Sequence, residues 1–166
     1  MNEVAAIYCS EVGIRSDIPT YSGGLGTNFG DTLKASADLG LPVVGVSLVY
    51  HNGYAAQKLV DGELKDGPQK WDPKKIGLTP VEERVEIPLH GRRVRIGAWR
   101  LEVQSKINPD GKVTLLLLDT NVDGNDYEAR RITNRLYDDR YKLEQNAVLG
   151  IGGVRMLQQL GFNVAT

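Results

Sequence analysis

The chain has 166 residues, a formal net charge of −1 and an apolar share of 41%, so we expect one soluble folded domain. The near-neutral charge gives no reason to expect a nucleic-acid-binding or anionic-membrane-binding protein. The single cysteine, Cys9, excludes a disulfide framework within the chain. No membrane-length apolar run and no signal peptide are found, so the sequence predicts a cytoplasmic protein.

The first part of the chain predicts a strand–loop–helix–strand unit. Residues 4–9 form a short apolar run, which is typical of a strand buried on both faces of a parallel sheet. A polar loop over 11–21 leads to a helix over 27–39, and residues 43–50 predict a second buried strand. We expect a right-handed crossover between parallel strands. The helix carries an apolar stripe at steps of four residues: Leu25, Phe29, Leu33, Ala37 and Leu41.

The middle of the chain changes to a period of two. Residues 81–87 and 94–100 alternate between apolar and charged side chains, and the turn at His90 and Gly91 joins them. This pattern predicts an inserted antiparallel hairpin, and 101–103 extends its second strand. Before the hairpin, 53–59 predicts an extended segment and 61–75 a loop.

The last part of the chain predicts one more buried strand and one long helix. Residues 113–119 are almost wholly apolar, whereas 122–139 are charged and polar. A helix is expected over 141–160, and 162–166 resembles the opening of another core strand. Because a domain seldom ends there, we expect a fragment of a longer protein. The predicted buried face of the helix consists of Leu143, Ala147, Ile151, Val154 and Leu157.

Three glycines, Gly23, Gly24 and Gly26, stand between the first strand and the first helix. Such a turn directs free backbone N–H groups and the positive end of the helix dipole at one point, which suits an anion or a sugar hydroxyl. The alternative is a tight turn in which glycine only permits close packing. Gly30 comes one residue too late for a dinucleotide fingerprint, and the lysine of a P-loop is missing.

Other candidate site residues follow the strands. Glu11, Asp119 and Asn121 come after strand ends, where α/β proteins place functional groups. Asp31 is a further candidate on the first helix, although with Lys34 it also suits a solvated helix face. No metal site is expected, because His51 and His90 lack metal spacing and are predicted to be surface residues. Trp71 and Trp99 are interpreted as packing residues.

Two adjacent motifs carry a family resemblance. Residues 8–14 (Tyr-Cys-Ser-Glu-Val-Gly-Ile) and 18–26 (Ile-Pro-Thr-Tyr-Ser-Gly-Gly-Leu-Gly) resemble the N-terminal signature of the α-glucan (glycogen, starch and maltodextrin) phosphorylases. The resemblance covers nearly the whole chain and continues through 30–42, 45–50, 53–54, 117–121, 132–137 and 144–160.

The resemblance implies a Rossmann-like domain of the glycosyltransferase type B fold. Residues 1–166 would be an incomplete N-terminal portion of it, without the cofactor domain. The implied reaction is reversible phosphorolysis of an α-glucan by inorganic phosphate to glucose 1-phosphate, with pyridoxal phosphate as cofactor in a homodimer. By resemblance, the N–H groups of Gly24 and Leu25 face the glucosyl residue and the phosphate, and Gly23 and Gly26 shape the turn. Glu11 matches an acid near the cofactor side of the active centre.

The sequence departs from the family pattern at several positions. Val12 replaces an aromatic residue, 27–29 replaces a smaller apolar run, and Ala55 and Ala56 replace a Phe-Arg-like pair. The family's cofactor lysine belongs to the C-terminal domain, so this chain alone is expected to be inactive. Two alternatives stay open: a nucleotide-sugar glycogen or starch synthase, in which a lysine replaces Tyr21, and a non-catalytic module that binds sugar phosphates or glucan.

Overall fold

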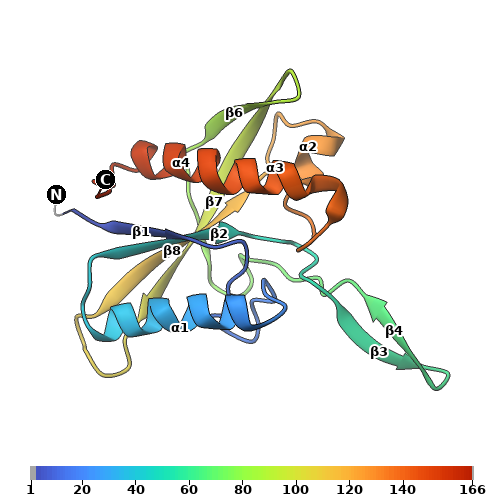
Figure 1. Ribbon diagram of the computed structural model, residues 1–166, viewed down its shortest axis with the longest axis horizontal. Helices are drawn as coiled ribbons and strands as arrows, with labels where there is room; N and C mark the ends of the chain where they lie inside the picture. Colours follow the sequence, from blue (N-terminus) through green and yellow to red (C-terminus); the bar gives the residue numbers. More distant parts are fainter. Residues whose placement is uncertain (1–2, 166) are drawn as a thin grey trace.

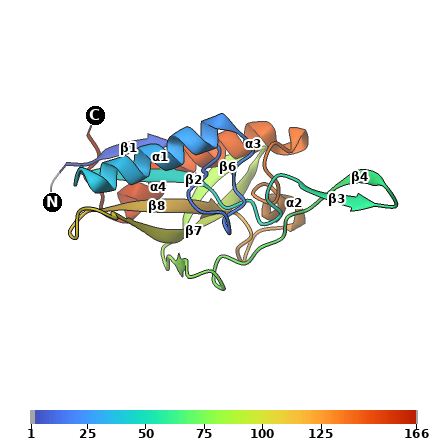
Figure 2. The same cartoon turned by 90° about the horizontal axis from the view of Figure 1, so that it is seen from below.

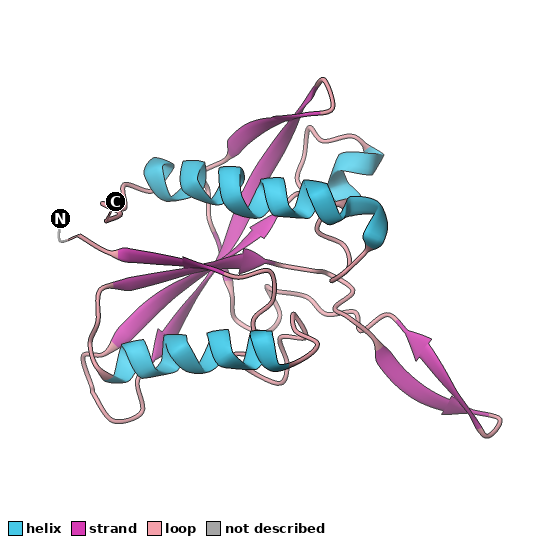
Figure 3. Cartoon of the chain, viewed as in Figure 1, coloured by secondary structure: helices cyan, strands magenta, loops and turns pink. Residues whose placement is uncertain are grey.

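The computed structural model describes residues 3–165 and shows a mixed α/β fold with helices on both faces of a six-stranded sheet (Figures 1 and 3). Helix α1 covers one face, and the long C-terminal helix covers the other. The elements, in chain order, are β1 (Ala5–Tyr8), α1 (Gly24–Asp38), β2 (Val43–Leu48), β3 (Ala56–Val60), β4 (Glu63–Gly67), β5 (Thr79–Pro80), β6 (Val85–Leu89), β7 (Arg92–Gln104), β8 (Lys112–Asp119), α2 (Tyr127–Arg131), η1 (Asp139–Tyr141), α3 (Lys142–Ala147), η2 (Val148–Gly152) and α4 (Gly153–Gln159).

The main sheet has the order β1-β2-β8-β7-β5, and β6 pairs with β7. β1, β2 and β8 run parallel, with Ala6 opposite Val44 and Val46 opposite Leu116. The predicted β1–α1–β2 unit is therefore confirmed. The predicted hairpin is confirmed as β6 and β7, and β7 also runs antiparallel along β8, which makes the sheet mixed. The carboxyl ends of β1, β2 and β8 meet at one edge of the sheet, where the candidate residues lie.

Helix α1 begins at Gly24, three residues earlier than predicted, so the glycine-rich stretch forms its first turn. Phe29, Leu33 and Ala37 are buried against the sheet as the spacing predicts. The two ends of the predicted stripe are not buried, since Leu41 is 45% and Leu25 56% exposed. Leu41 lies beyond the helix, and Leu25 lies in its first turn, where the sheet does not cover it.

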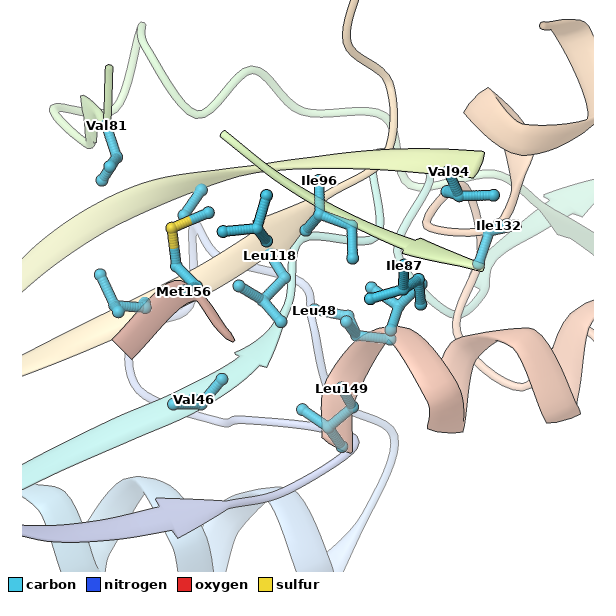
Figure 4. Packing of buried hydrophobic residues seen from close by; sticks show 14 of the residues in the cluster. Val46, Leu48, Val81, Ile87, Val94, Ile96, Leu118, Ile132, Leu149 and Met156 are labelled. Atoms are coloured by element: carbon cyan, nitrogen blue, oxygen red, sulfur yellow. The ribbon is translucent and has the colours of Figure 1, made fainter. Parts of the chain in front are cut away.

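The C-terminal helix is continuous from α3 through the π-helical segment η2 to α4, but the predicted buried face is wrong at three positions. Leu143, Ile151 and Val154 are exposed, whereas the sheet-facing residues include Leu149 and Met156 (Figure 4). Glycines explain the difference. A Cβ at Gly152 would lie 2.5 Å from Ile96 Cδ1, and one at Gly153 would lie 2.7 Å from Tyr8 Cε1. The helix therefore packs its glycine side on the sheet, as close approach requires. The buried side consists of Gln145, Val148, Leu149, Gly152, Gly153, Met156 and Leu157.

Two five-residue elements were not predicted. The loop expected over 61–75 contains strand β4, which pairs with β3 in a separate antiparallel hairpin that extends away from the rest of the chain (Figures 1 and 2). The polar stretch 122–139 contains α2, whose N-terminus is capped by Asp126 accepting from the Ala129 N–H. Both elements have few buried side chains, so hydrophobic periodicity did not indicate them.

The outermost parallel strand, β1, is exposed to half-buried rather than buried on both faces, because it lies at the sheet edge. Beside it, Val164 forms a parallel bridge with Val4, in the stretch predicted to open a strand. Thr166, the last residue of that prediction, lies outside the described residues. Within residues 3–165, no helix has the length and apolar character needed to cross a membrane.

Candidate functional site

The carboxylate of Glu11 joins the end of β1 to the first turn of α1. Its Oε1 accepts a hydrogen bond of 3.0 Å from the Gly26 N–H, and its Oε2 accepts bonds of 2.7 Å from the Ser22 N–H and 3.0 Å from the Ser22 hydroxyl. The residue is only 2% exposed. A buried carboxylate is stable here because three donors and the positive end of the helix dipole compensate its charge.

The three clustered glycines have different surroundings. A Cβ at Gly26 would lie 2.5 Å from Tyr21 Cβ and 3.2 Å from Glu11 Cγ, so this position requires glycine for packing. A Cβ at Gly23 or Gly24 would meet nothing within 4 Å. The packing alternative therefore explains Gly26 but gives no reason for Gly23 and Gly24, which line open space.

The first turn of α1 has both open space around it and backbone N–H groups without an acceptor. Gly23, Gly24 and Leu25 are exposed. Among residues 3–165, the backbone N–H groups of Gly24 and Leu25 have no hydrogen-bond acceptor. Two unpaired N–H groups at a helix N-terminus can donate to an anion or to a sugar hydroxyl.

Two tyrosines that the motif analysis did not single out surround Glu11. Tyr50 is buried, and its hydroxyl donates 2.7 Å to the Ser10 carbonyl oxygen. Burial, together with the nearby Glu11 charge, raises the pKa of the Tyr137 hydroxyl. Both tyrosines have positive φ, 40° and 56°, which is strained for a bulky residue and is found more often at functional sites. Periodicity carries no signal for such a conformation.

Tyr137 also contacts Tyr54. The two rings meet edge to face with their centroids 6.1 Å apart, and both side chains are more than one-third exposed. The Glu11 site is thus bordered by aromatic side chains from the segments that follow β2 and α2. Aromatic and hydroxyl surfaces of this kind suit an uncharged polar ligand such as a sugar.

Asp119 lies at the same sheet edge, but its side chain belongs to a hydrogen-bond network separate from that of Glu11. Its carboxylate accepts from Trp99 Nε1 at 2.9 Å and from the Asn121 N–H at 2.7 Å, and both its oxygens lie 3.0 Å from His51 Nε2. Burial raises the pKa of Asp119, but the bonds from His51, Trp99 and Asn121 outweigh it and hold the pKa below its usual value. Asp119 therefore braces the ends of β2 and β8 against the middle of β7.

The remaining candidates lie apart from the glycine turn. The Asn121 side chain is exposed and lines a cavity of about 450 Å³ with His51 and Arg131, among others. Asp31 forms an exposed ion pair with Lys34 at 3.4 Å. No hydrogen bond or ion pair among residues 3–165 joins Asp31, Asp119 or Asn121 to Glu11 or the first turn of α1. The structure thus brings together Glu11 and Gly23–Gly26.

The predictions for the histidines and tryptophans have mixed outcomes. His51 is half-buried against Asp119, so its assignment to the surface was wrong, because the motif analysis did not foresee a buried acid beside it. His90 is exposed and lies 2.8 Å from Glu144. Packing roles are confirmed for Trp71 and Trp99, which lie against the α1 side of the core.

A glycine turn at the carboxyl edge of parallel strands is typical of α/β proteins that bind a ligand at that edge. No protein-family model matches the chain. Curated relatives do: it is 35% identical to the maltodextrin phosphorylase of Thermococcus litoralis, a match covering 98% of this chain and 20% of that protein. It is 36% identical to the glycogen phosphorylase of Mycobacterium tuberculosis, over 92% of this chain and 18% of that protein.

A third relative, the glycogen phosphorylase of Aquifex aeolicus, is also 36% identical, over 92% of this chain and 22% of its own length. The chain is thus homologous to a segment of the glycogen and maltodextrin phosphorylases, and the family resemblance seen in the motifs is confirmed. It spans about a fifth of the length of these relatives.

Proposed function

We propose that this chain forms one wall of the active site of an α-glucan phosphorylase, in which the first turn of α1 faces the glucosyl residue and the phosphate. In this proposal, residues 1–166 are the N-terminal portion of a Rossmann-like domain of the glycosyltransferase type B fold. The reaction is α-glucan plus inorganic phosphate in equilibrium with the shortened glucan and glucose 1-phosphate.

The observation that carries the proposal is the arrangement of donors around Glu11. Glu11 fixes the turn through Ser22 and Gly26 and leaves the N–H groups of Gly24 and Leu25 directed at open space. Fixed dipoles that need no reorganisation stabilise charge as it develops on a transferred group. A sugar–phosphate bond that breaks beside this turn would have such donors within reach.

The charges at this turn support the view that it is only half of a site. Glu11 offsets part of the positive end of the α1 dipole, and no Lys or Arg side chain bonds to Glu11 or to Gly23–Gly26 among residues 3–165. A phosphate dianion needs further cations. We assign these to polypeptide outside the 166 residues.

Pyridoxal phosphate, which the resemblance implies, also needs groups that this turn does not supply. This cofactor supplies a phosphate group as acid–base partner of the substrate phosphate. The free N–H groups of Gly24 and Leu25 suit a phosphate, but within residues 3–165 no lysine bonds to this turn for covalent attachment. In the proposal the cofactor is held elsewhere in the full phosphorylase, and the homodimer is a property of that whole protein.

The synthase alternative is less well supported. It calls for a cation at position 21 to hold the nucleotide-sugar phosphate, whereas Tyr21 is uncharged there. A Cβ at Gly13 would lie 3.2 Å from the Tyr21 ring, so this tyrosine packs closely against the loop.

A chimera tests the proposal. These 166 residues replace the matched segment of the Thermococcus litoralis maltodextrin phosphorylase, and glucose 1-phosphate release from maltodextrin and phosphate is measured. We expect an active chimera whose kcat/KM falls by about 100-fold with Gly24→Val, because a fixed donor at the reacting group is blocked. Gly150→Val, at another glycine with open space around it, is the matched control.

Two results would contradict the proposal. Full activity of the folded Gly24→Val chimera would show that the turn does not face substrate. Glucose 1-phosphate release by the 166-residue chain alone, with pyridoxal phosphate added, would show that the chain is more than half of a site.

A further inference from the structure

Gln145 is a buried polar residue of the C-terminal helix that belongs to neither of the hydrogen-bond networks described above. It is 6% exposed and lies in α3, which runs directly into the π-helical segment η2. Its Nε2 donates hydrogen bonds of 2.8 Å to the Ile132 carbonyl oxygen and of 2.9 Å to the Arg135 carbonyl oxygen. Both N–H donors of the side chain amide therefore bond to one loop, 132–136, and fix that loop to the helix.

The loop 132–136 is bonded in turn to the segment that follows β2. The Asn52 N–H donates 2.8 Å to the Asn134 carbonyl oxygen, and Asn52 Nδ2 donates 2.7 Å to Asn134 Oδ1. Arg135 Nε donates 3.2 Å to the Tyr54 carbonyl oxygen. Because these bonds join the two segments, the position of the loop also determines the position of the segment that carries Tyr54.

Each of the two joined segments leads into an aromatic residue at the border of the Glu11 site. Tyr54 and Tyr137 meet edge to face, and both are partly exposed. Tyr137 has a φ of 56°, a conformation that persists only where the surroundings hold it. Arg135, whose carbonyl oxygen accepts from Gln145, lies only two residues before Tyr137. The hydrogen bonds of Gln145 thus reach both tyrosines through a short stretch of backbone.

We propose that Gln145 is a positioning residue, which holds Tyr54 and Tyr137 in the arrangement that receives an uncharged sugar ring. The inference rests on the proposed function, in which the N–H groups of Gly24 and Leu25 donate to the phosphate. The two substrates then depend on different parts of the chain. Loss of the Gln145 donors is expected to weaken glucan binding and to leave phosphate binding unchanged.

Gln145→Met tests the proposal, because it removes both donors and keeps an unbranched side chain of similar length. In the chimera with the Thermococcus litoralis maltodextrin phosphorylase, it is expected to raise the KM for maltodextrin by about 10-fold, while kcat and the KM for phosphate stay unchanged. A merely structural role would instead lower the amount of folded enzyme without changing either KM. Gln158→Met, at an exposed glutamine of the same helix, is the matched control.

A second measurement does not depend on activity. The N–H groups of Asn52 and Leu136 bond to the carbonyl oxygens of Asn134 and Gly53. Gln145→Met is expected to speed their hydrogen exchange by about 10-fold and to leave the amides of β2 and β8 unchanged, because only the joined segments loosen. Unchanged exchange at these two amides would overturn the proposal.

Two kinetic results would also overturn the proposal: an unchanged KM for maltodextrin, or an equal rise in both KM values. If Gln145→Met does not fold, Asn52→Ala tests the same linkage, since it removes one hydrogen bond of a partly exposed side chain. We expect a rise of about 3-fold in the KM for maltodextrin, and no rise would overturn the proposal. An inactive unmodified chimera would count against the proposed function, whereas hydrogen exchange tests the role of Gln145 without it.

Discussion

Glu11 is the residue through which the end of β1 meets the first turn of α1. Its three hydrogen bonds span 11 to 15 residues of chain. The motif pattern predicted both Glu11 and the glycines as site residues, but not that the carboxylate would use the Gly26 N–H. That pairing depends on how the 11–21 loop folds back on the helix, and no local periodicity encodes it.

Gly24 and Gly26 are expected to differ in how much an alanine substitution changes the stability of the fold. Gly26→Ala is expected to destabilise the fold by about 2 kcal/mol, because its Cβ would overlap the Tyr21 side chain. Gly24→Ala is expected to change stability by less than about 0.5 kcal/mol, because its Cβ meets open space. Thermal unfolding of both variants checks the assignment, and equal Tm values would contradict it.

Asp119 is a bracing residue, and its lowered pKa predicts an acid-sensitive contribution to stability. A carboxyl with a depressed folded-state pKa stabilises the fold above its unfolded pKa of about 4, and this stabilisation is lost as the pH falls through the folded-state value. Asp119→Asn is expected to cost about 2 to 4 kcal/mol at pH 7 and to flatten the loss of stability below about pH 4.

Urea unfolding between neutral and acid pH measures this effect. Asp17→Asn is the control, since Asp17 forms an exposed ion pair with Arg15 and should contribute little. An Asp119→Asn protein whose stability falls with acid as steeply as that of the unmodified chain would show that Asp119 is not the titrating group.

The elements of the fold were predicted where side chains alternate or repeat around a buried face. The β6–β7 hairpin follows from the alternation across His90 and Gly91, and β2 and β8 from their apolar runs. β4 was missed because its five residues are polar or exposed. The face of the C-terminal helix was misassigned because its closest approach to the sheet is made by Gly152 and Gly153, which hydrophobicity patterns count as gaps.

That helix gives a direct test at the scale of an element. Ile151→Ser should change stability by less than about 0.5 kcal/mol, because the side chain is exposed. Met156→Ala should cost about 2 to 5 kcal/mol, because Met156 is fully buried in the core. Chemical unfolding measures the two losses of stability. A larger loss for Ile151→Ser than for Met156→Ala would support the buried face predicted from the apolar spacing instead.

At the scale of the whole molecule, the chain is homologous to about a fifth of a phosphorylase. The family followed from contiguous motifs, since Glu11 and the glycine turn lie close together in sequence. The tyrosines near Glu11 could not be predicted from these motifs, because Tyr50 and Tyr137 are distant from Glu11 in sequence and come near it only in the folded chain. The proposed half-site supplies fixed N–H donors and leaves cations and cofactor to other polypeptide.

An NMR titration of the ¹⁵N-labelled chain with glucose 1-phosphate tests whether the first turn of α1 binds the sugar phosphate. We expect the amide signals of Gly24 and Leu25 to shift saturably, Gly24→Val to abolish the shifts, and Gly150→Val to preserve them. Unchanged Gly24 and Leu25 signals, or shifts confined to the cavity around His51 and Asn121, would contradict it.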